Sequence, residues 1–466
     1  MSEVRDKCGV FGIWQDPQAA YKTYLGLYAL QHRGEESCGI VTTDGQKMFS
    51  HKGMGHVQDV ISEEVISRLK GHSAVGHVRY STSGSSLLKN AQPLLVDFSK
   101  GEVAVAHNGN IVNADFLRSE LEAYGAIFQT TTDSEIVLHL MAKPTFRNVE
   151  EGIVDALGRI DGAFCLVFLT HDLLVGARDP WGFRPLWLGK TREGAYCFAS
   201  ETCALDLIDA QPVREIEPGE VVLISGKDKV KSLRIDRPVA RTAHCIFEHV
   251  YFARPDSMIF GENVHLVRKN LGRQLAKEHP AEADIVIPVP DSGNSAALGY
   301  SEESGIPLDI GIIRNHYVGR TFIQPAQGMR DFKVRVKFNQ LKEVLAGKRV
   351  VVVDDSIVRG TTSRVRVKSL RAAGAKEVHV RISCPPHRFP CAYGIDFPSR
   401  KELIANEKSI EEIRKYLECD TIGYLSMEGM LGSVKLSKEK FCTACWSGDY
   451  PVPFNEQGKY FAEKCQ

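Results

Sequence analysis

The sequence of 466 residues contains no apolar run that approaches the roughly 18 residues of a membrane-spanning helix. It also has no excess of charge of either sign, because Lys+Arg and Asp+Glu both count 58 and the formal net charge is +0. A protein that binds nucleic acid or a membrane surface by general electrostatics needs a basic excess. We therefore expect no nucleic-acid partner and no membrane partner.

The first residues, MSEVRDKCGVFG, include no long apolar segment ahead of a small-residue cleavage site. This pattern predicts that the chain has no secretory signal. We therefore expect a cytoplasmic location. In a reducing compartment the 12 cysteines are interpreted as thiols, metal ligands or a nucleophile before disulfides are considered. No low-complexity linker and no repeat of solenoid period is present, so two directly packed halves are expected.

The two halves differ in their patterns. The first half reads as short strands joined by Gly-rich turns, with a helix over residues 19–31, which favours packed sheets with helices outside. After about residue 235 the runs DIVIPVP, PLDIGII, KRVVVVDD and EVHVRI are nearly all apolar, as strands buried in a parallel sheet are. The helix after VVVVDD is predicted to be capped near Thr361–Ser363 and to stop at Gly374. From about residue 400 the stretch KELIANEKSIEEIRKYL is charged and predicted to be helical, and a Cys-containing tail follows it.

Five segments of the first half carry side chains suited to catalysis: CGVFG, LQHRGEES, GHVRYST, HNGN and TTDSE. Taken alone, Cys8 is most simply a small buried apolar residue. Together and in this order, the segments resemble the N-terminal-nucleophile glutamine amidotransferases over about the first 230 residues. The resemblance implies an αββα fold in which Cys8 becomes the nucleophile after residues 1–7 are removed as a propeptide.

The residue types fit that chemistry. An N-terminal cysteine has its own base, because an α-amine titrates near pH ~8 and can accept the thiol proton. The side-chain amide of Asn108 and the N–H of Gly109 can form an oxyanion hole. Arg79 suits the carboxylate of free glutamine and Asp133 suits its ammonium group. Thr82, in the same segment as Arg79, is assigned to the glutamine site as well.

The segment VVVVDDSIVRGTTS, residues 350–363, is the most specific signal in the chain. A buried strand ends in two aspartates, and a loop with Gly360 and several hydroxyl residues leads into a helix N-terminus, which favours a phosphate. The adjacent acids suit a sugar diol or a hydrated Mg²⁺. A Walker A loop is not indicated, since Arg184 stands where the first glycine before Gly189-Lys190-Thr191 belongs.

This segment resembles the phosphoribosyl-diphosphate (PRPP) motif of type I phosphoribosyltransferases. Two further segments fit: PVPDSGNSAA places Ser292 at the end of another strand, and residues 314–339 form a basic, Gly-containing segment. On spacing alone residues 314–339 are an ordinary surface loop, but the matched family uses this region as a lid over the pyrophosphate. The resemblance implies one Mg²⁺ per subunit at Ser292, Asp354 and Asp355, and PRPP contacts from Asp354, Asp355, Ser356, Arg359, Gly360, Thr361, Thr362, Ser363 and Tyr317.

Over nearly the whole chain, including YFARPDS and RFPCAYGID, the sequence resembles the glutamine PRPP amidotransferase family. The resemblance implies a class II glutamine amidotransferase domain at residues 8–235 and a phosphoribosyltransferase domain with a helical tail at residues 236–466, thus α+β and α/β in one chain. It implies conversion of glutamine, PRPP and water to 5-phosphoribosylamine, glutamate and diphosphate, feedback inhibition by purine nucleotides, and a homotetramer. A non-catalytic, nucleotide-sensing regulator is the alternative, disfavoured because nucleophile and lid segment are both present.

Cys442 and Cys445 form a CxxC pair, which can belong to a redox pair, a zinc site or an iron–sulfur site. Resemblance to the Bacillus-like branch of the family implies a structural [4Fe–4S] cluster held by these two residues with Cys245 and Cys391. Spacing alone does not exclude zinc, and Cys384 is a rival for Cys391. The remaining cysteines are interpreted as packing or surface thiols: Cys38, Cys165, Cys197, Cys203, Cys419 and Cys465.

Overall fold

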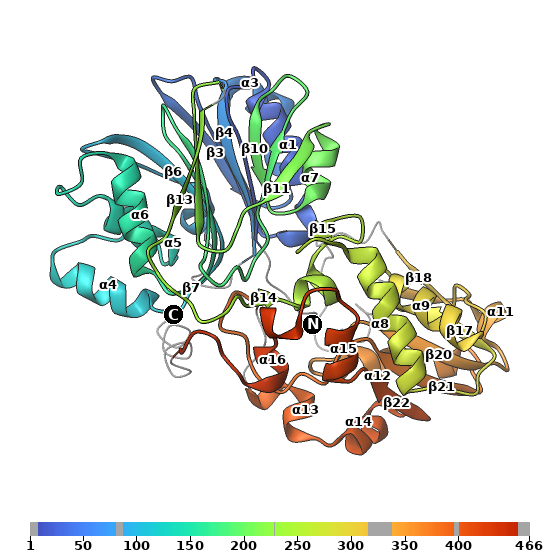
Figure 1. Ribbon diagram of the computed structural model, residues 1–466. Coiled ribbons are helices and arrows are strands. Elements are labelled where there is room, and N and C mark those ends of the chain that lie inside the picture. Colours follow the sequence, from blue (N-terminus) through green and yellow to red (C-terminus); the bar gives the residue numbers. More distant parts are fainter. Residues whose placement is uncertain (1–7, 81–86, 228, 316–337, 396–399, 455–466) are drawn as a thin grey trace.

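The computed structural model describes residues 8–80, 87–227, 229–315, 338–395 and 400–454 (Figure 1). Four of the sequence-based predictions lie outside these ranges: the propeptide at residues 1–7, Thr82 in the glutamine site, Tyr317 in the segment expected to form the lid, and the thiol Cys465.

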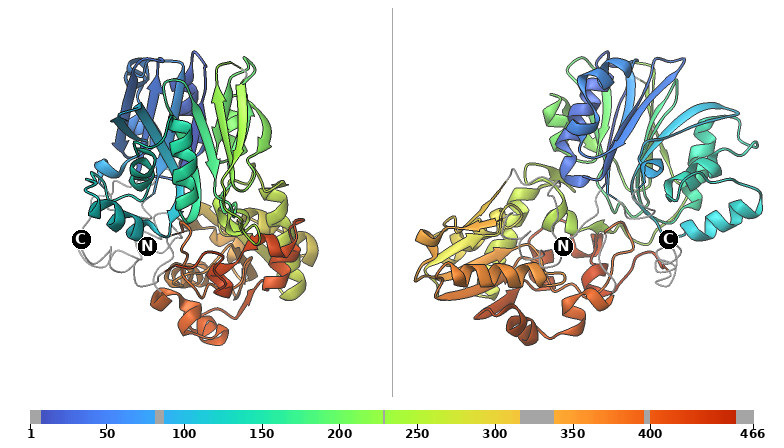
Figure 2. Two further views of the ribbon diagram at one scale, coloured as in Figure 1. Left: turned by 60° about the vertical axis from the view of Figure 1, so that its left-hand side comes forward. Right: turned by 180° about the vertical axis from the view of Figure 1, so that it is seen from behind.

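The first half consists of two stacked antiparallel sheets with helices on their outer sides, so the predicted αββα architecture is confirmed (Figures 1 and 2). One sheet has seven strands in the order β11 (Gln211–Glu215), β9 (Trp187–Lys190), β10 (Tyr196–Ala199), β1 (Gly9–Ile13), β4 (Ser73–Arg79), β2 (Ser37–Thr43) and β3 (Met48–Met54). The other has six, in the order β13 (Lys229–Arg234), β12 (Glu220–Ser225), β8 (Leu174–Arg178), β7 (Gly162–Leu169), β6 (Gly101–Ile111) and β5 (Leu94–Phe98).

The helices of this half follow the sheets they cover. Against the seven-stranded sheet pack α1 (Ala19–Ala29), α2 (Val57–Val60) and α7 (Thr202–Leu207), with α3 (Glu63–Arg68) and the short 3-10 helix η1 (Gln31–Arg33) beside them. The six-stranded sheet is covered by α5 (Ser134–Met141), α6 (Val149–Arg159) and α4 (Ala114–Ala123), and η2 (Leu88–Asn90) precedes β5. Buried apolar side chains of both sheets, such as Val10, Val75 and Val167, fill the space between them.

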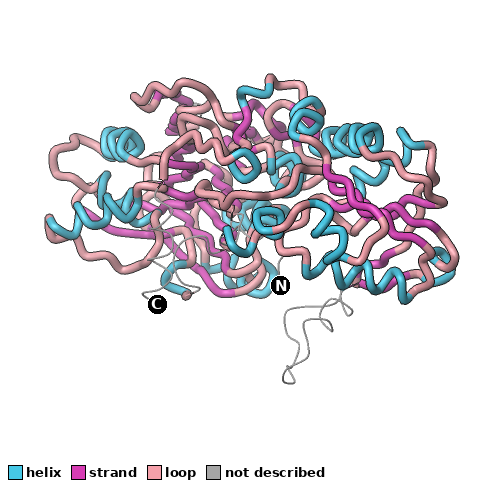
Figure 3. The backbone as a smooth tube through the Cα atoms, turned by 90° about the horizontal axis from the view of Figure 1, so that it is seen from below, coloured by secondary structure: helices cyan, strands magenta, loops and turns pink. Residues whose placement is uncertain are grey.

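The second half is built around a parallel sheet of β17 (Ile285–Pro288), β20 (Arg349–Asp354), β21 (Glu377–Ile382) and β22 (Thr421–Tyr424). Its helices are α8 (Val264–Glu278), α9 (Asn294–Ser304), α11 (Lys342–Leu345), α12 (Thr361–Ala372), α13 (Ile404–Glu407), α14 (Ile410–Leu417), α15 (Met427–Gly432) and α16 (Ala444–Ser447), with 3-10 helices η4 (Arg400–Glu402) and η5 (Lys438–Lys440). Short ribbons complete it: β14 (His244–Cys245) with β23 (Phe441–Cys442), β15 (Met258–Ile259) with β16 (Glu262–Asn263), and β18 (Ile312–Arg314) with β19 (Phe338–Gln340). Seen from below, each half has its own group of strands (Figure 3).

Two expectations for this half need correction. The run PLDIGII is not a strand of the parallel sheet. It meets that sheet at one bridge, between Leu308 and Val286, its Ile310 is 56% exposed, and its last two residues belong to the separate strand β18. The helical prediction for residues 401–417 agrees with α13 and α14, and after them Thr421–Tyr424 adds a fourth parallel strand too short to show a pattern in sequence. The helix α12 begins and ends where expected, but Gly360, with φ +75°, holds the cap position instead of a hydroxyl residue.

The two halves meet along a buried seam. The π-helix η3 (Glu248–Phe252) follows β14 and is covered on one side by the first half. Glu248 pairs there with Arg33 and Arg184, both fully buried. A second contact joins Asn110 Nδ2 to the Ala392 carbonyl oxygen at 2.8 Å. These bonds place the ends of β4 and β6 beside the second half.

Candidate functional site

Cys8 lies directly before β1, at the edge of the first half that faces the seam. Its side chain is 7% exposed, and its Sγ is 3.6 Å from the Tyr80 carbonyl oxygen. Because β1 pairs with β4 so that Gly9 is opposite Val78, Arg79 at the end of β4 is carried to the same place. Arg79 is buried and its Nη1 lies 3.3 Å from Glu36 Oε1. The structure therefore brings the predicted nucleophile and the predicted carboxylate-binding cation to one end of the sheet.

Asn108 and Gly109 lie on β6 of the facing sheet. The Asn108 side chain is 2% exposed, and its amide Nδ2 has no hydrogen-bond partner within the described part of the chain. A buried amide donor without an acceptor is costly, so it is expected to serve a bound group. At Gly109, φ is +153° and a Cβ atom would stand 2.0 Å from the Ala163 carbonyl oxygen, so only glycine fits. Both features suit the predicted oxyanion hole.

Asp133 is tied to this strand. It lies at the start of α5, and its Oδ2 accepts the Ile111 N–H at 2.9 Å, two residues beyond Gly109. Burial acts to raise the pKa of Asp133, but nearby His107 and the hydrogen bonds to the carboxylate outweigh it and hold that pKa below its usual range. His107 itself is anchored across the sheets, because its carbonyl oxygen is 2.8 Å from His77 Nε2 on β4. An ionised carboxylate thus stands beside the oxyanion strand.

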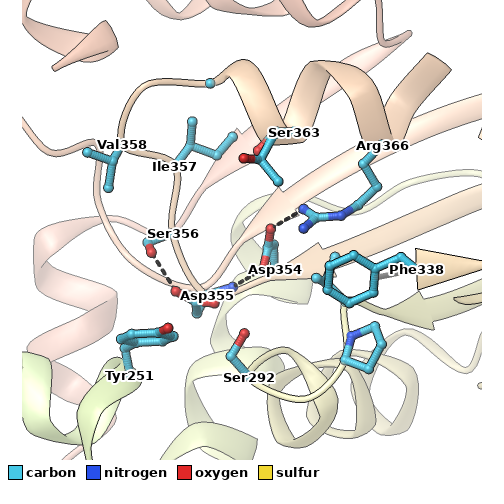
Figure 4. Close-up of a pocket in the computed structure, with 14 residues that line it drawn as sticks. Tyr251, Ser292, Phe338, Asp354, Asp355, Ser356, Ile357, Val358, Ser363 and Arg366 are labelled. Carbon is cyan, nitrogen blue, oxygen red and sulfur yellow. Dashed lines mark hydrogen bonds and ion pairs between the residues drawn. The ribbon is translucent and has the colours of Figure 1, made fainter. Parts of the chain in front are cut away.

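One pocket of the second half opens at the carboxyl end of β20 (Figure 4). Seven of the residues predicted for PRPP or Mg²⁺ line it: Ser292, Asp354, Asp355, Ser356, Gly360, Thr362 and Ser363. Thr361 and Arg359 are not among its lining residues, and Arg359 Nη2 instead contacts Glu402 Oε2 at 2.5 Å. The N-terminus of α12 faces the pocket, so its N–H groups and dipole can receive a phosphate.

The two aspartates of the pocket are buried side by side. Burial, and next to it the charge of Asp354, raise the pKa of Asp355 to about 7. Hydrogen bonds from the hydroxyls of Ser292 and Ser356 oppose that rise. A cation or sugar hydroxyls bound here would relieve the repulsion between the two carboxylates.

Seven lining residues had been given no role from the sequence. Four are apolar residues of the quoted segments, and the other three are Tyr251 of η3, Phe338 of β19 and Arg366 of α12. Arg366 had a usable signal, because it stands four residues after Thr362 and thus on the same face of the helix. Tyr251 lies in the quoted segment YFARPDS but had been given no role. Its place follows from the π-helix, which local sequence does not reveal.

The four cysteines predicted as cluster ligands come from three segments and are all buried next to one another. Parallel pairing of β14 with β23 sets Cys245 opposite Cys442. Cys445 follows on α16, and its carbonyl oxygen accepts the N–H groups of Arg388 and Phe389, which fixes the approach to Cys391. Burial and then the charges of Cys391 and Cys245 raise the pKa of the Cys445 thiol, so these sulfurs lie within electrostatic reach of one another.

The rival thiol, Cys384, lies toward the phosphoribosyl pocket. After burial, the charges of Asp355 and Asp354 are the strongest causes that raise its pKa. Its Sγ contacts the Pro385 carbonyl oxygen at 3.3 Å. Across the described ranges, no three His, Cys, Asp or Glu side chains are grouped as ligands of a single metal ion. The other thiols are buried packing residues as expected, namely Cys38, Cys165, Cys197, Cys203 and Cys419, and Cys465 lies outside the described residues.

Comparison with known proteins covers both halves. A family model described as "Glutamine amidotransferase domain" matches residues 77–207. The amidophosphoribosyltransferase of Bacillus subtilis is 48% identical over 454 residues, which are 96% of this chain and 95% of that protein. The amidophosphoribosyltransferase of Methanocaldococcus jannaschii is 48% identical over 465 residues, 96% of this chain and 98% of that protein.

A solved structure gives the same result. The glutamine PRPP amidotransferase from B. subtilis complexed with ADP and GMP superposes with a TM-score of 0.91 at 48% sequence identity. The match covers 96% of this chain and 98% of that one. No helix within the described ranges is long and apolar enough to cross a membrane.

Proposed function

The chain belongs to the amidophosphoribosyltransferase family, and we propose that it converts glutamine, PRPP and water to 5-phosphoribosylamine, glutamate and diphosphate, the first committed step of purine synthesis. The observation that carries the proposal is the pocket at the end of β20, where Ser292, two aspartates and the N-terminus of α12 converge. Cys8 and the oxyanion strand lie in the same chain, across the seam. Ammonia released at one site can therefore serve the other.

In the glutamine half, removal of residues 1–7 would give Cys8 a free α-amine. That amine takes the thiol proton, and Sγ attacks the glutamine amide carbon. The oxyanion that forms is received by the unpartnered Asn108 amide and the Gly109 N–H, which need no rearrangement to do so. Arg79 and Asp133, both buried and charged, are proposed to hold the carboxylate and the ammonium of the substrate. Thr82 is kept as a further proposed contact.

In the second half, the helix terminus with Thr361, Thr362 and Ser363 is proposed to hold the 5-phosphate of PRPP, and Asp354 and Asp355 to face the ribose hydroxyls. Ser356, Arg359, Gly360 and Tyr317 remain proposed PRPP contacts. The carboxylates and the Ser292 hydroxyl are oxygen donors of the kind Mg²⁺ prefers, so they fit this ion. When bound, Mg²⁺ would neutralise charge on the departing diphosphate.

Cys245, Cys391, Cys442 and Cys445 are proposed to hold a [4Fe–4S] cluster. The donor set fits, since it consists of four buried thiols from three segments. A single zinc ion binds thiolates at ~2.3 Å, so all of its ligand sulfurs must lie close to one another. A [4Fe–4S] cluster binds each thiolate at a different iron atom, so the sulfurs can lie farther apart. Such a cluster would tie the tail to the core of the transferase half and take no part in the reaction.

Regulation and assembly are proposed from family membership. A relative is described as complexed with ADP and GMP, and we propose that purine nucleotides inhibit this chain too. A homotetramer and a cytoplasmic location remain predictions.

The test is the dependence of glutamine hydrolysis on PRPP. With PRPP and Mg²⁺ present, the purified enzyme should form 5-phosphoribosylamine from glutamine and also from ammonia. Without PRPP it should form none, and glutamine hydrolysis should be slower. Product from neither nitrogen source, together with intact PRPP binding, would leave the non-catalytic nucleotide-sensing regulator as the correct reading.

A further inference from the structure

Arg366 is the only cation among the residues that line the phosphoribosyl pocket in the described part of the chain. Its Nη1 lies 2.6 Å from Asp354 Oδ2, and its side chain is only 11% exposed. The same guanidinium lies over the Phe338 ring, 5.8 Å from the ring centre. Figure 4 shows it reaching from α12 to the side of Asp354 that faces away from Asp355.

Each side-chain oxygen of Asp354 accepts a hydrogen bond from the protein. Its Oδ1 accepts the Asp355 N–H at 3.0 Å, and its Oδ2 accepts the hydrogen bond from Arg366. Asp355 makes no ion pair within the described ranges, and its hydrogen-bonding neighbours are the hydroxyls of Ser292 and Ser356 and the Asp354 carboxyl group. The two acids therefore differ: Asp354 is paired with a cation and fixed in direction, and Asp355 lines the pocket without an ion-pair partner.

We propose that Arg366 is a positioning residue of the phosphoribosyl site, which holds Asp354 by an ion pair and leaves Asp355 as the acid without an ion-pair partner in the pocket. This inference rests on the proposed function of the pocket. Since PRPP is strongly anionic, a second uncompensated carboxylate would repel it, and a fixed Asp354 can offer its remaining lone pairs to a ribose hydroxyl. Arg366 thus acts on the substrate through Asp354.

Other charged or titratable groups face the acids from neighbouring elements, but none contacts Asp354 as Arg366 does. Arg268 on α8 interacts electrostatically with Asp355. Its guanidinium donates hydrogen bonds to the carbonyl oxygens of His249 and Ala253. Tyr251 lines the pocket from η3, and Cys384 lies beyond the end of β21. The compensation of Asp354 therefore depends on Arg366.

The test compares Arg366→Met, Arg366→Lys and the control Arg364→Met, by calorimetric titration with Mg²⁺ alone and with PRPP. Arg364 is two residues away on the same helix and binds Glu418 at the surface. Loss of one charge-assisted hydrogen bond predicts PRPP binding about 10- to 100-fold weaker in Arg366→Met. Mg²⁺ alone should bind the same variant more tightly, because two uncompensated carboxylates then face it. Arg366→Lys should restore both values toward wild type, and Arg364→Met should match wild type.

The opposite signs distinguish positioning from a damaged fold, which would weaken both ligands. Turnover with ammonia should show a raised PRPP KM with a smaller change in kcat. In an Asp354→Asn background, Arg366→Met should change PRPP affinity by no more than about twofold, because its target is gone. Equal losses in both backgrounds would overturn the proposal in favour of direct substrate contact, as would wild-type behaviour of Arg366→Met. If wild-type enzyme itself binds no PRPP, the function proposed for the pocket fails instead. Should Arg366→Met be insoluble, Arg366→Gln takes its place under the same criteria.

Discussion

Arg33 and Glu248 form a fully buried ion pair across the seam, with Arg33 Nη2 2.8 Å from Glu248 Oε1. Arg33 also donates from Nε to the Cys8 carbonyl oxygen at 3.0 Å. The backbone of the proposed nucleophile is thus attached to η3, whose Tyr251 lines the phosphoribosyl pocket. One chain of direct contacts joins the two candidate sites.

Glu248→Gln should destabilise the protein, because it leaves Arg33 and Arg184 buried without this carboxylate. Removing one partner of a buried pair costs about 3–5 kcal/mol. Urea unfolding followed by circular dichroism measures the loss. Arg68→Met, which breaks the exposed pair with Glu64, is the control and should cost at most about 1 kcal/mol. Equal stability of the two variants would contradict the role of the seam.

Cys8→Ala should abolish the use of glutamine and leave synthesis from ammonia, because the two reactions occupy separate halves. Intact-mass measurement should also show that the active enzyme begins at Cys8. Cys38→Ala, which removes a buried packing thiol of β2, is the control and should retain both activities. A fully active enzyme that retains residues 1–7 would contradict the assignment of the α-amine as base.

Asn108→Ala should lower glutamine hydrolysis by about 10²- to 10³-fold with little change in the glutamine KM, as loss of an oxyanion donor does. Asn113→Ala is a matched control, since the Asn113 amide donates to the Arg159 carbonyl oxygen away from the site. Steady-state kinetics of glutamine hydrolysis measures kcat and the glutamine KM of both variants. A change confined to KM would place Asn108 in ground-state binding.

The fold was predictable where local pattern and burial agree. VVVV before the two aspartates forms the buried strand β20, and the glycines and apolar residues around Cys8 and Asn108 form the paired sheets. The prediction for PLDIGII was wrong because apolar composition does not show whether a segment lies at the centre or at the edge of a sheet. Edge position depends on contacts between segments distant in sequence.

The site shows the same limit. Single residues within a motif, such as Asp354 and Ser363, were located in the pocket as predicted. Arg359 is in the same motif, yet its side chain turns to Glu402, a partner 43 residues later that no motif specifies. Tyr251 and Phe338 reach the pocket from other elements, so only the tertiary structure identifies them.

Asp354→Asn and Asp355→Asn should each impair synthesis from ammonia as well as from glutamine, because both routes share the ribosyl transfer. The expected loss is greater for Asp355, because Asp354 is already paired with Arg366 whereas Asp355 makes no ion pair within the described ranges. Parallel assays with the two nitrogen sources measure it. Wild-type rates from either source in both variants would show that the phosphoribosyl site is elsewhere.

The final prediction concerns the four cysteines. Cys442 and Cys445 lie in the tail, Cys245 precedes η3, and Cys391 follows β21, so a metal group bound by all four would close long loops of the chain. We expect a brown protein that contains iron and acid-labile sulfide and that bleaches and progressively unfolds in air. Replacing any one of the four by serine should give unstable or insoluble protein.

Cys384→Ser is the matched control, because Cys384 is as deeply buried as the four but lies toward the aspartates of the pocket. It should leave the iron and sulfide content unchanged. Elemental analysis of protein purified without oxygen identifies the metal. If it finds zinc in place of iron, the four cysteines remain the ligands but the assignment of an iron–sulfur cluster is wrong. A colourless, air-stable and fully active enzyme would refute the metal site altogether, and because the glutamine and PRPP sites share no ligand with it, their assignments would stand.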